Sequence, residues 1–256
     1  MIRVAAVGDV HLGPDLVGRH RAGLEDIDQH ADVLLLAGDL TRHGTVDEAE
    51  IVADEYRGLP VPVVAVLGNH DYHSDRAEEV TELLRGAGLI VLEGEGVVLD
   101  LPQGRLGVAG AKGFGLGFAG RSASDFGEPE MKDFSRTGRR SGELLADALA
   151  DVATQAPDFT VALTHYAPVD GTLVGEPPEI WAFLGNYLLG KAIDEGDADL
   201  AVHGHAHAGT ERGNTEAGVR VRNVAQPVIR AAYAVYDVQT TSQPGRVDTS
   251  VQRASG

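Results

Sequence analysis

The sequence contains no cysteine, and this absence excludes a whole group of chemistries. Disulfide bonds, zinc–thiolate sites, cysteine-ligated iron–sulfur clusters and thiol nucleophiles all need the cysteine sulfur. Any metal site in this chain must therefore be built from oxygen and nitrogen ligands. A chain without cysteine is also typical of the reducing cytoplasm, which is the location that we expect for the protein.

Long hydrophobic runs are absent as well. The longest purely apolar segments, such as Val33–Ala37, are far shorter than the ~20 residues that cross a bilayer. Only a few apolar residues separate Arg3 from Asp9 near the start, whereas a secretory signal needs roughly 7–15 in a row. We therefore expect no targeting segment, no membrane span and no membrane partner.

Positive charge is scarce. The chain has 21 Lys and Arg against 39 Asp and Glu, a formal net charge of −18. Such a surface repels the phosphate backbone on average, so we expect no stable complex with nucleic acid. Hydrophobic residues at 43% and charged residues at 23% are ordinary for a globular protein, and 256 residues suit one large domain.

Short apolar runs alternate with amphipathic segments, a pattern that is typical of α/β domains. The expected strands are Ile2–Val7, Val33–Ala37, Val61–Leu67, Phe159–Thr164 and Leu200–Val202, followed by the further strands Leu89–Leu92, Val97–Leu101, Arg105–Ala109, Val219–Val224 and Ala232–Val238. The expected helices are Val46–Arg57, Asp75–Arg85, Gly142–Val152 and Ile180–Ile193. The clustered later strands indicate a second, more antiparallel sheet.

Two segments lack clear periodicity. Residues 239–256 are polar, and we expect a loose tail there, which leaves a single domain over residues 1–238. Residues 112–140 are rich in Gly, Ser and Arg and carry a small positive charge in an acidic chain. Two interpretations stay open for that segment: a flexible surface loop, or a lid that offers cations to a phosphate.

Polar residues able to bind a metal follow five of the expected strands. They are Asp9 and His11, Asp39, Asn69 with His70 and Asp71, His165, and His205 with His207. In an open α/β sheet, ligands bind at the carboxyl ends of the strands. If these strands run the same way in one sheet, the side chains meet at one edge.

A glycine directly precedes the candidate ligand at four of the five strand ends. These pairs are Gly8-Asp9, Gly38-Asp39, Gly68-Asn69 and Gly204-His205. Glycine permits a sharp turn and lets the backbone approach a compact centre. Carboxylate, amide and imidazole ligands without thiolate suit Mn, Fe, Zn, Ni or Co. Seven such ligands with one shared carboxylate can hold two ions, an arrangement used in phosphoryl transfer.

In their order and spacing these motifs resemble the calcineurin-like metallophosphoesterases. The matching motifs are Asp9-Val10-His11, Gly38-Asp39-Leu40, Gly68-Asn69-His70-Asp71, Thr164-His165 and Gly204-His205-Ala206-His207. The resemblance spans residues 9–207. It implies a four-layer α/β sandwich with two central mixed β-sheets flanked by helices.

The resemblance also implies the part of each residue. One metal ion would be held by Asp9, His11, Asp39 and His207, and the second by Asp39, Asn69, His165 and His205. A hydroxide bridging the two divalent ions would attack phosphorus, with His70 not a ligand but a general acid or a group that stabilises the transition state. Asp71 either orients His70 or is simply a turn residue before the next helix.

Substrate contacts are less clearly marked. Many family members have a second acid where this chain has Arg42, which either touches a substrate phosphate or is an exposed structural residue. His43 and His73 follow the site motifs closely enough to reach a substrate. We expect His20 and His30 to be surface residues and His203 to make a local hydrogen bond.

The sequence thus predicts a metal-dependent phosphoesterase acting on a small phosphomonoester or phosphodiester, with a nucleotide-like diester preferred. The alternative from another class is a non-catalytic metal-binding scaffold or regulatory protein of the same fold. Oligomeric state is left open.

Overall fold

Two six-stranded sheets form the centre of the molecule in the computed structural model, which describes residues 1–238 and 252–253. The first sheet has the order β14-β13-β1-β2-β3-β4. Its strands are β1 (Ile2–Val7), β2 (Val33–Ala37), β3 (Val63–Val66), β4 (Ile90–Val91), β13 (Ala234–Val238) and β14 (Gln252–Arg253). Strands β1 to β4 are parallel, and β13 pairs with β1 antiparallel.

The second sheet has the order β11-β12-β10-β9-β6-β5. Its strands are β5 (Glu95–Leu101), β6 (Gly104–Ala111), β9 (Phe159–Thr164), β10 (Leu200–His203), β11 (Arg212–Asn214) and β12 (Arg220–Asn223). The four central strands run parallel, and the edge strands β5 and β11 are antiparallel to their neighbours. The fold is therefore a mixed α/β architecture with two mixed sheets, as the sequence predicts.

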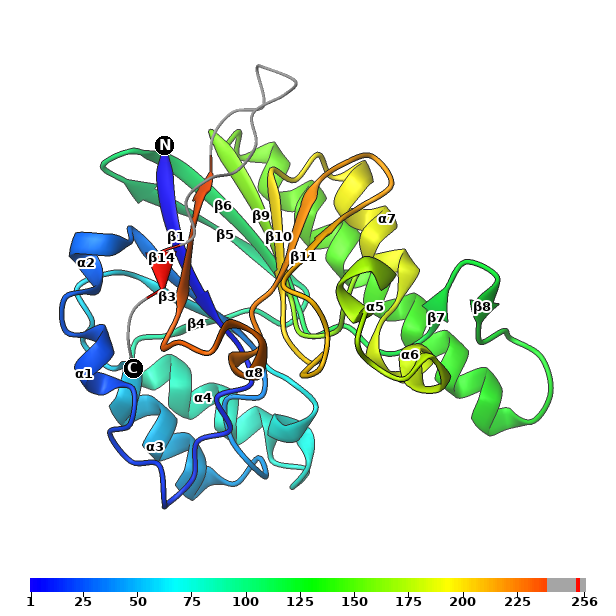
Figure 1. Cartoon of the computed structure of the whole chain (residues 1–256), viewed down its shortest axis with the longest axis horizontal. Helices are drawn as coiled ribbons and strands as arrows, with labels where there is room; N and C mark the ends of the chain where they lie inside the picture. Colours follow the sequence, from blue (N-terminus) through cyan, green and yellow to red (C-terminus); the bar gives the residue numbers. More distant parts are fainter. Residues whose placement is uncertain (239–251, 254–256) are drawn as a thin grey trace.

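Helices cover the outer faces of both sheets (Figure 1). On the side of the first sheet lie α1 (Arg21–Leu24), α2 (Ile27–His30), α3 (Val46–Tyr56) and α4 (Ala77–Gly86). On the side of the second lie α5 (Pro129–Thr154), α6 (Trp181–Leu184) and α7 (Tyr187–Glu195). The remaining elements are the short hairpin of β7 (Gly117–Phe118) with β8 (Arg121–Ser122), helix α8 (Gln226–Ile229) and three 3₁₀ turns, His70–Tyr72, Asp170–Leu173 and Pro178–Ile180.

The apolar core follows from the two-residue period of the strands. In β9, Val161 and Leu163 belong to the large core shared with the first sheet, whereas Ala162 belongs to a second cluster with α5 and α7. The first sheet is apolar on both faces, since every residue of β2 is buried. This pattern is what a parallel strand covered on both sides requires.

Helix α3 shows how local sequence sets a boundary. Thr45 accepts a hydrogen bond from the backbone N–H of Glu48, and the Glu48 carboxylate reaches back to the backbone N–H of Thr45. This capping box satisfies N–H groups that have no partner within the helix. The helix starts at Val46, as predicted from the sequence.

The N-terminal half of α5 corrects the expectation of a loop across residues 112–140. The helix begins at Pro129 and is 26 residues long, so only the first part of that segment is irregular or hairpin. Its buried face contains Ser135, Gly138, Ser141 and Gly142 instead of large apolar residues. A Cβ on Gly138 would lie 2.7 Å from the carbonyl oxygen of Gly115, so close packing demands a small residue and hides the helical period.

The single helix expected over Ile180–Ile193 is also wrong. Gly185 adopts an extended conformation and separates α6 from α7. A side chain at this position would meet the Phe118 ring and, at 2.6 Å, the carbonyl oxygen of Ala167. Asn186 then caps α7 by accepting a hydrogen bond from the N–H of Leu188 at 2.9 Å.

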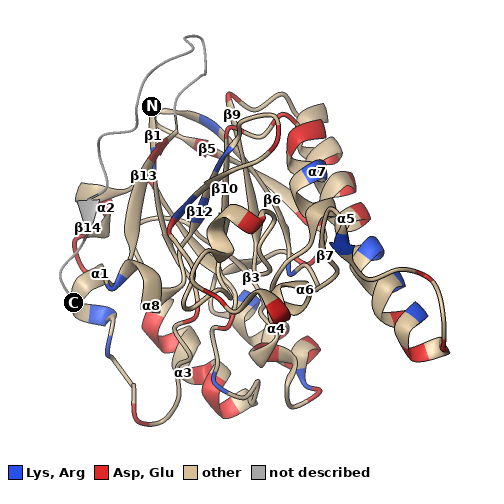
Figure 2. Cartoon of the chain, turned by 45° about the vertical axis from the view of Figure 1, so that its right-hand side comes forward, with Lys and Arg blue, Asp and Glu red and all other residues tan. Residues whose placement is uncertain are grey.

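The late strands do not share one antiparallel sheet. Strand β12 lies parallel to β10 in the second sheet, and β13 joins the first. Most of the expected tail lies outside the described residues, but Gln252–Arg253 pairs with β13 as an edge strand. Within the described residues, no helix is both apolar and long enough to cross a membrane. Acidic residues are spread over the surface helices (Figure 2).

Candidate metal centre

The two sheets meet at the carboxyl ends of their parallel strands. Gly8, directly after β1, forms a parallel bridge with Ala225, which follows β12. The N–H of Gly8 donates to the carbonyl of Val224 at 2.9 Å, and the N–H of Asp9 donates to the carbonyl of Gly38 at 2.9 Å. The predicted site residues therefore come together from both sheets rather than from the edge of one sheet.

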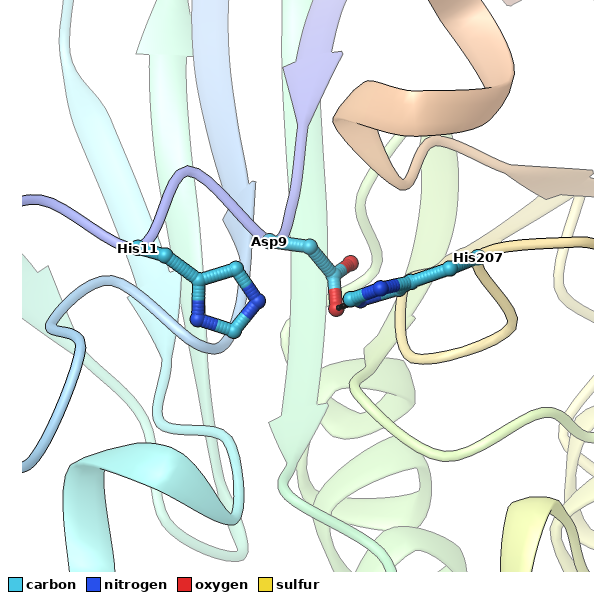
Figure 3. A group of neighbouring side chains, drawn as sticks. All are labelled: Asp9, His11 and His207. Carbon is cyan, nitrogen blue, oxygen red and sulfur yellow. Dashed lines mark hydrogen bonds and ion pairs between the residues drawn. The ribbon is translucent and has the colours of Figure 1, made fainter.

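A first group joins Asp9, His11 and His207, whose ligand atoms lie within 4.8 Å of one another. Figure 3 shows the Asp9 carboxylate between the two imidazole rings. His207 Nε2 is 2.9 Å from Asp9 Oδ1. The buried Asp9 carboxylate also accepts hydrogen bonds from the backbone N–H of His205.

A second group joins Asp39, His165 and His205 within the same limit. His165 Nδ1 faces the carbonyl of Ala37 at 2.9 Å, so its N–H points away from the site. His165 Nε2 lies 2.9 Å from Asn69 Oδ1 and 3.3 Å from Asp39 Oδ1. With the ring proton on Nδ1, the Nε2 lone pair faces these two oxygens, and a cation bound among the three atoms would stabilise the arrangement.

A third group within the same limit joins Asp39 to His11 and His70, so Asp39 links the first two groups. Its Oδ2 is 3.8 Å from His11 Nε2 and 3.9 Å from His70 Nε2, while its Oδ1 accepts a hydrogen bond from the backbone N–H of His70 at 2.8 Å. Asp39 is almost fully buried. It occupies the position of a shared carboxylate between two clusters of imidazole ligands.

His11 carries the clearest sign of a missing partner. Its Nε2 is buried and makes no hydrogen bond within residues 1–238 and 252–253, which leaves a polar atom desolvated without compensation. Burial lowers the pKa of His11, so the ring is neutral and its nitrogen lone pair is available. The donor set around this atom fits a divalent metal ion.

The surroundings shift the pKa values of three further ligands in different directions. Burial lowers the pKa of His205 to about 3, and the Nε2 of that ring lies 3.3 Å from the carbonyl of Phe183. The hydrogen bond to Asp9 raises the pKa of His207. Burial opposes ionisation of Asp9, but the hydrogen bond from His207 and the nearby His165 hold its pKa below the ordinary value. His205 is therefore neutral with a lone pair to offer, and Asp9 is ionised, so both groups favour a bound cation.

The glycines before the ligands serve mainly as contact points between strands. A Cβ on Gly38 would lie 2.6 Å from His165 Nδ1, and one on Gly68 would lie 2.8 Å from the Asp39 Cγ. A Cβ on Gly204 would lie 2.8 Å from the carbonyl oxygen of Ala37 and would overlap Asp9 Oδ2. Only Gly38 of these three has a positive φ. Close approach between strands, more than turn geometry, explains these glycines.

Backbone strain gathers at the same place. Four non-glycine residues with positive φ are proposed ligands: Asp9, His11, Asp39 and His205. Such conformations cost of the order of 1–3 kcal/mol each and persist where the surrounding structure enforces them. Their clustering indicates a functional centre.

His70 lies beside Asp39 with its ring 4.5 Å from that of His11. Its Nδ1 donates to the carbonyl of Arg42 at 2.8 Å, which turns Nε2 toward the Asp39 carboxylate. The ring is partly exposed, with 44% of the side chain accessible. His70 is thus oriented by a backbone carbonyl and reachable from solvent.

Asp71 differs from the expectation that it orients the His70 ring. Its buried carboxylate accepts hydrogen bonds from the backbone N–H groups of Gly68, Leu40 and Thr41, and from the Thr41 hydroxyl at 2.6 Å. Burial and the charge of Asp39 raise the pKa of Asp71. Asp71 ties the loop after β2 to the loop after β3, and so positions both Asp39 and Asn69.

The three expected substrate residues have other partners. Arg42 Nη2 forms an ion pair with Asp15 at 2.7 Å, in line with the structural alternative. His43 Nδ1 lies 3.0 Å from Glu48 Oε1 at the start of α3, and the His73 ring is 6.1 Å from the His43 ring. Both histidines are exposed, and neither belongs to the ligand groups found among the described residues.

His203 agrees with its prediction. It is fully buried, with Nδ1 2.7 Å from the carbonyl of Gly204 and Nε2 2.8 Å from the Thr172 hydroxyl. His20 is buried instead of exposed, which corrects that expectation. His30 lies on the surface.

Two residues near the site were not predicted from the sequence. Tyr166 was not singled out, and Lys112 was considered only as part of residues 112–140. The Tyr166 ring centroid is 4.4 Å from that of His205, and Lys112 Nζ lies 5.5 Å from the Tyr166 ring. The one signal for Tyr166 in the sequence is its position directly after the motif residue His165.

A cavity of about 470 Å³ lies beside α6, lined by Phe118, Arg121 and Trp181 among others, and none of the proposed ligands lines it.

The family described as calcineurin-like phosphoesterase matches residues 2–209. No curated protein sequence matches the chain. A phosphopantetheinyl hydrolase from Mycobacterium tuberculosis is similar in structure, with a TM-score of 0.61, 15% identity, and coverage of 94% of this chain and 98% of that one.

A protein from Thermus thermophilus has a TM-score of 0.58 at 15% identity, with 93% and 94% of the two chains covered. A proposed 5′-nucleotidase from Staphylococcus aureus has a TM-score of 0.58 at 16% identity, and the match covers 99% of this chain but 53% of the other. At such low identities these structures are evidence of a shared fold alone.

Proposed function

Because the chain belongs to the calcineurin-like phosphoesterases, we propose that it hydrolyses small phosphate esters with two bound divalent metal ions. Asp9, His11 and His207 would hold one ion, and Asn69, His165 and His205 the other. Asp39 would bind both. The donor set suits Mn, Fe, Zn, Ni or Co.

The observation that supports this most strongly is the buried His11 Nε2, which has no hydrogen bond to any described residue and lies 3.8 Å from Asp39 Oδ2. A structural histidine in this position would be paired, as His203 is. Ions held by these ligands would supply Lewis acidity to the phosphoryl oxygens and make a water molecule more acidic.

His70 would serve as the general acid. The Arg42 carbonyl holds its Nδ1–H, so Nε2 is the atom that faces the site, and in the doubly protonated ring Nε2–H can give its proton to the departing oxygen. A positioned acid of this kind contributes about 10²–10⁴-fold to the rate. Asp71 would act indirectly, by holding the two loops that carry Asp39 and Asn69.

The substrate would be a phosphomonoester or phosphodiester of a small molecule. Two of the similar structures are described as a phosphopantetheinyl hydrolase and a proposed 5′-nucleotidase, which supports small phosphate compounds as a class. The preference for a nucleotide-like diester and the cytoplasmic location stay predictions.

The test compares hydrolysis of p-nitrophenyl phosphate and bis-p-nitrophenyl phosphate with Mn²⁺, with and without a chelator. We expect activity that the chelator removes, and its loss in Asp39→Asn. The matched control is Asp147→Asn, which changes an exposed carboxylate on α5 in the same way. Metal binding without hydrolysis of either ester would instead support the scaffold alternative, and absence of metal binding would refute the proposed centre.

A further inference from the structure

Lys112 lies at the end of β6 and is one of only three lysines, against eighteen arginines, in this chain. Its backbone carbonyl accepts hydrogen bonds from the N–H groups of His165 and Tyr166, at 3.0 and 3.1 Å. The start of the Lys112 side chain is thereby fixed relative to a proposed metal ligand.

Aromatic rings surround the ammonium group. Lys112 Nζ lies 4.8 Å from the ring centroid of Tyr72 and 5.5 Å from those of Phe114 and Tyr166. Tyr72 follows His70 by two residues, and Tyr166 packs against His205. The ammonium is therefore held between the turn that carries the proposed acid and the loop that carries a proposed ligand.

Two of the three rings around the ammonium, those of Tyr72 and Phe114, make further contacts that hold them in place. The Tyr72 hydroxyl donates to Glu93 Oε2 at 2.7 Å, and Glu93 Oε1 accepts from the N–H of Leu67 at 3.1 Å. The ring centroids of Phe114 and Phe134 lie 5.3 Å apart with the planes tilted by 59°, which continues the apolar wall along α5. These contacts fix the rings of Tyr72 and Phe114 beside Lys112.

The Lys112 ammonium has N–H donors that are not used by any group among the described residues. Its only hydrogen bond within the described residues goes to the carbonyl of Gly113 at 3.3 Å, and no carboxylate there lies within ion-pair distance. A lysine has three N–H donors, and a half-buried ammonium normally uses them on an anion or on water. Burial lowers its pKa, against which the charges of Glu93 and Asp39 act.

We propose that Lys112, held between Tyr72, Phe114 and Tyr166, binds a second anionic group of the substrate, a carboxylate or a further phosphate. The preferred substrates are then phosphate esters whose leaving group carries its own negative charge. This inference rests on the proposed function, because it takes the reacting phosphate to lie among the metal ligands. Lys112 makes the site select for charge on the leaving group.

The test uses a series of ω-carboxyalkyl phosphates of increasing chain length and their neutral amide counterparts. All are primary alkyl esters, so only the second charge differs at each length. We expect the wild-type protein to have a kcat/KM about tenfold or more higher for one or more acids than for the matching amide, as for a charge-assisted hydrogen bond. Lys112→Met should remove this preference and leave the amides within about twofold of wild type. Lys112→Arg should retain part of the preference.

Lys191→Met is the charge control, because Lys191 is exposed on α7 and pairs with Glu195 at 3.6 Å. It should leave the acid-to-amide ratio unchanged. An equal loss on acids and amides in Lys112→Met would place Lys112 at the reacting phosphate and overturn the proposal. An unchanged ratio, or a wild-type protein without any preference across the series, would overturn it too.

A binding measurement separates this inference from the proposed function. Calorimetric titration of the Mn²⁺-loaded protein with the non-hydrolysable phosphonate of the preferred acid, and with its amide, reports the same preference without turnover. If the wild-type protein hydrolyses nothing yet binds the acid more tightly in a Lys112-dependent way, the anion subsite stands and the hydrolase proposal fails. If it hydrolyses all the esters and shows no charge preference in binding, the hydrolase proposal stands and the anion subsite fails.

Discussion

Replacement of Gly204 by alanine tests whether the glycines beside the ligands are required by close approach between the sheets. The new Cβ would lie 2.8 Å from the carbonyl oxygen of Ala37 and 3.3 Å from the Asp9 Cγ, with the Asp9 Oδ2 closer still. Neither partner can yield easily, since Asp9 is almost fully buried and bonded to the N–H of His205 and to His207. Either the Asp9 carboxylate or the loop carrying Gly204 must shift.

The magnitude follows from two opposing effects. Overpacking of this kind typically costs about 1–3 kcal/mol of folding free energy. Alanine in place of glycine returns roughly 0.4–1 kcal/mol by restricting the unfolded chain. Since Gly204 does not have a positive φ, no conformational strain is added. Displacement of a ligand carboxylate should also weaken metal binding, by about 10–100-fold if the effect is like that of losing a contact that orients a ligand.

Gly86→Ala provides the matched control. Gly86 is the last residue of α4, has no positive φ, and a Cβ there would meet no atom of the described residues within 4 Å. Urea unfolding in chelator should show this variant as stable as wild type or slightly more so, and Gly204→Ala as less stable. Titration with Mn²⁺ against a chromophoric chelator should show weaker binding in Gly204→Ala alone. If both variants matched in stability and metal affinity, close approach could not be the reason for the glycine.

Three further outcomes are expected. Asp71→Asn should lower the free energy of unfolding by about 1–3 kcal/mol in urea titrations, because the amide leaves buried N–H donors facing an NH₂ group. A variant as stable as wild type would contradict the inference that Asp71 holds the loops after β2 and β3 together. Burial sets the pKa of His203 at about 4, below the ordinary 6.5, so the unfolded chain takes up the proton first. Stability of the metal-free protein should fall as the pH drops from about 6.5 toward 4, by roughly 3 kcal/mol at most. A His203→Gln variant followed over the same pH range should lose less, and an identical pH profile would be inconsistent with a neutral buried ring. His70→Ala should keep its metal content by elemental analysis yet lose about 10²–10⁴-fold in rate; loss of metal instead would show that His70 is a ligand.

Local pattern was enough for most of the strands. Val33–Ala37 and Phe159–Thr164 have the predicted bounds, since short apolar runs of β-branched and Leu residues have few alternatives to a buried strand. Helix α5 was missed over its first half, because the residues that it buries there, such as Ser135 and Gly138, are small or polar. A helix is recognised in a sequence by the regular spacing of its hydrophobic residues. A helix face that packs through small residues and backbone contacts has no such spacing.

The sequence by itself determined which side chains are available as ligands and where along the strands they stand. The order of Asp9, Asp39, Asn69, His165 and the late histidines after apolar runs is a property of the chain, and chemistry limits what such residues bind. Only the tertiary structure decided how they meet. Two sheets join through Gly8 and Ala225, the Arg42 carbonyl turns the His70 ring, and Lys112 is set among aromatic rings. These contacts link residues far apart in sequence, and their geometry depends on packing between layers, which no local pattern records.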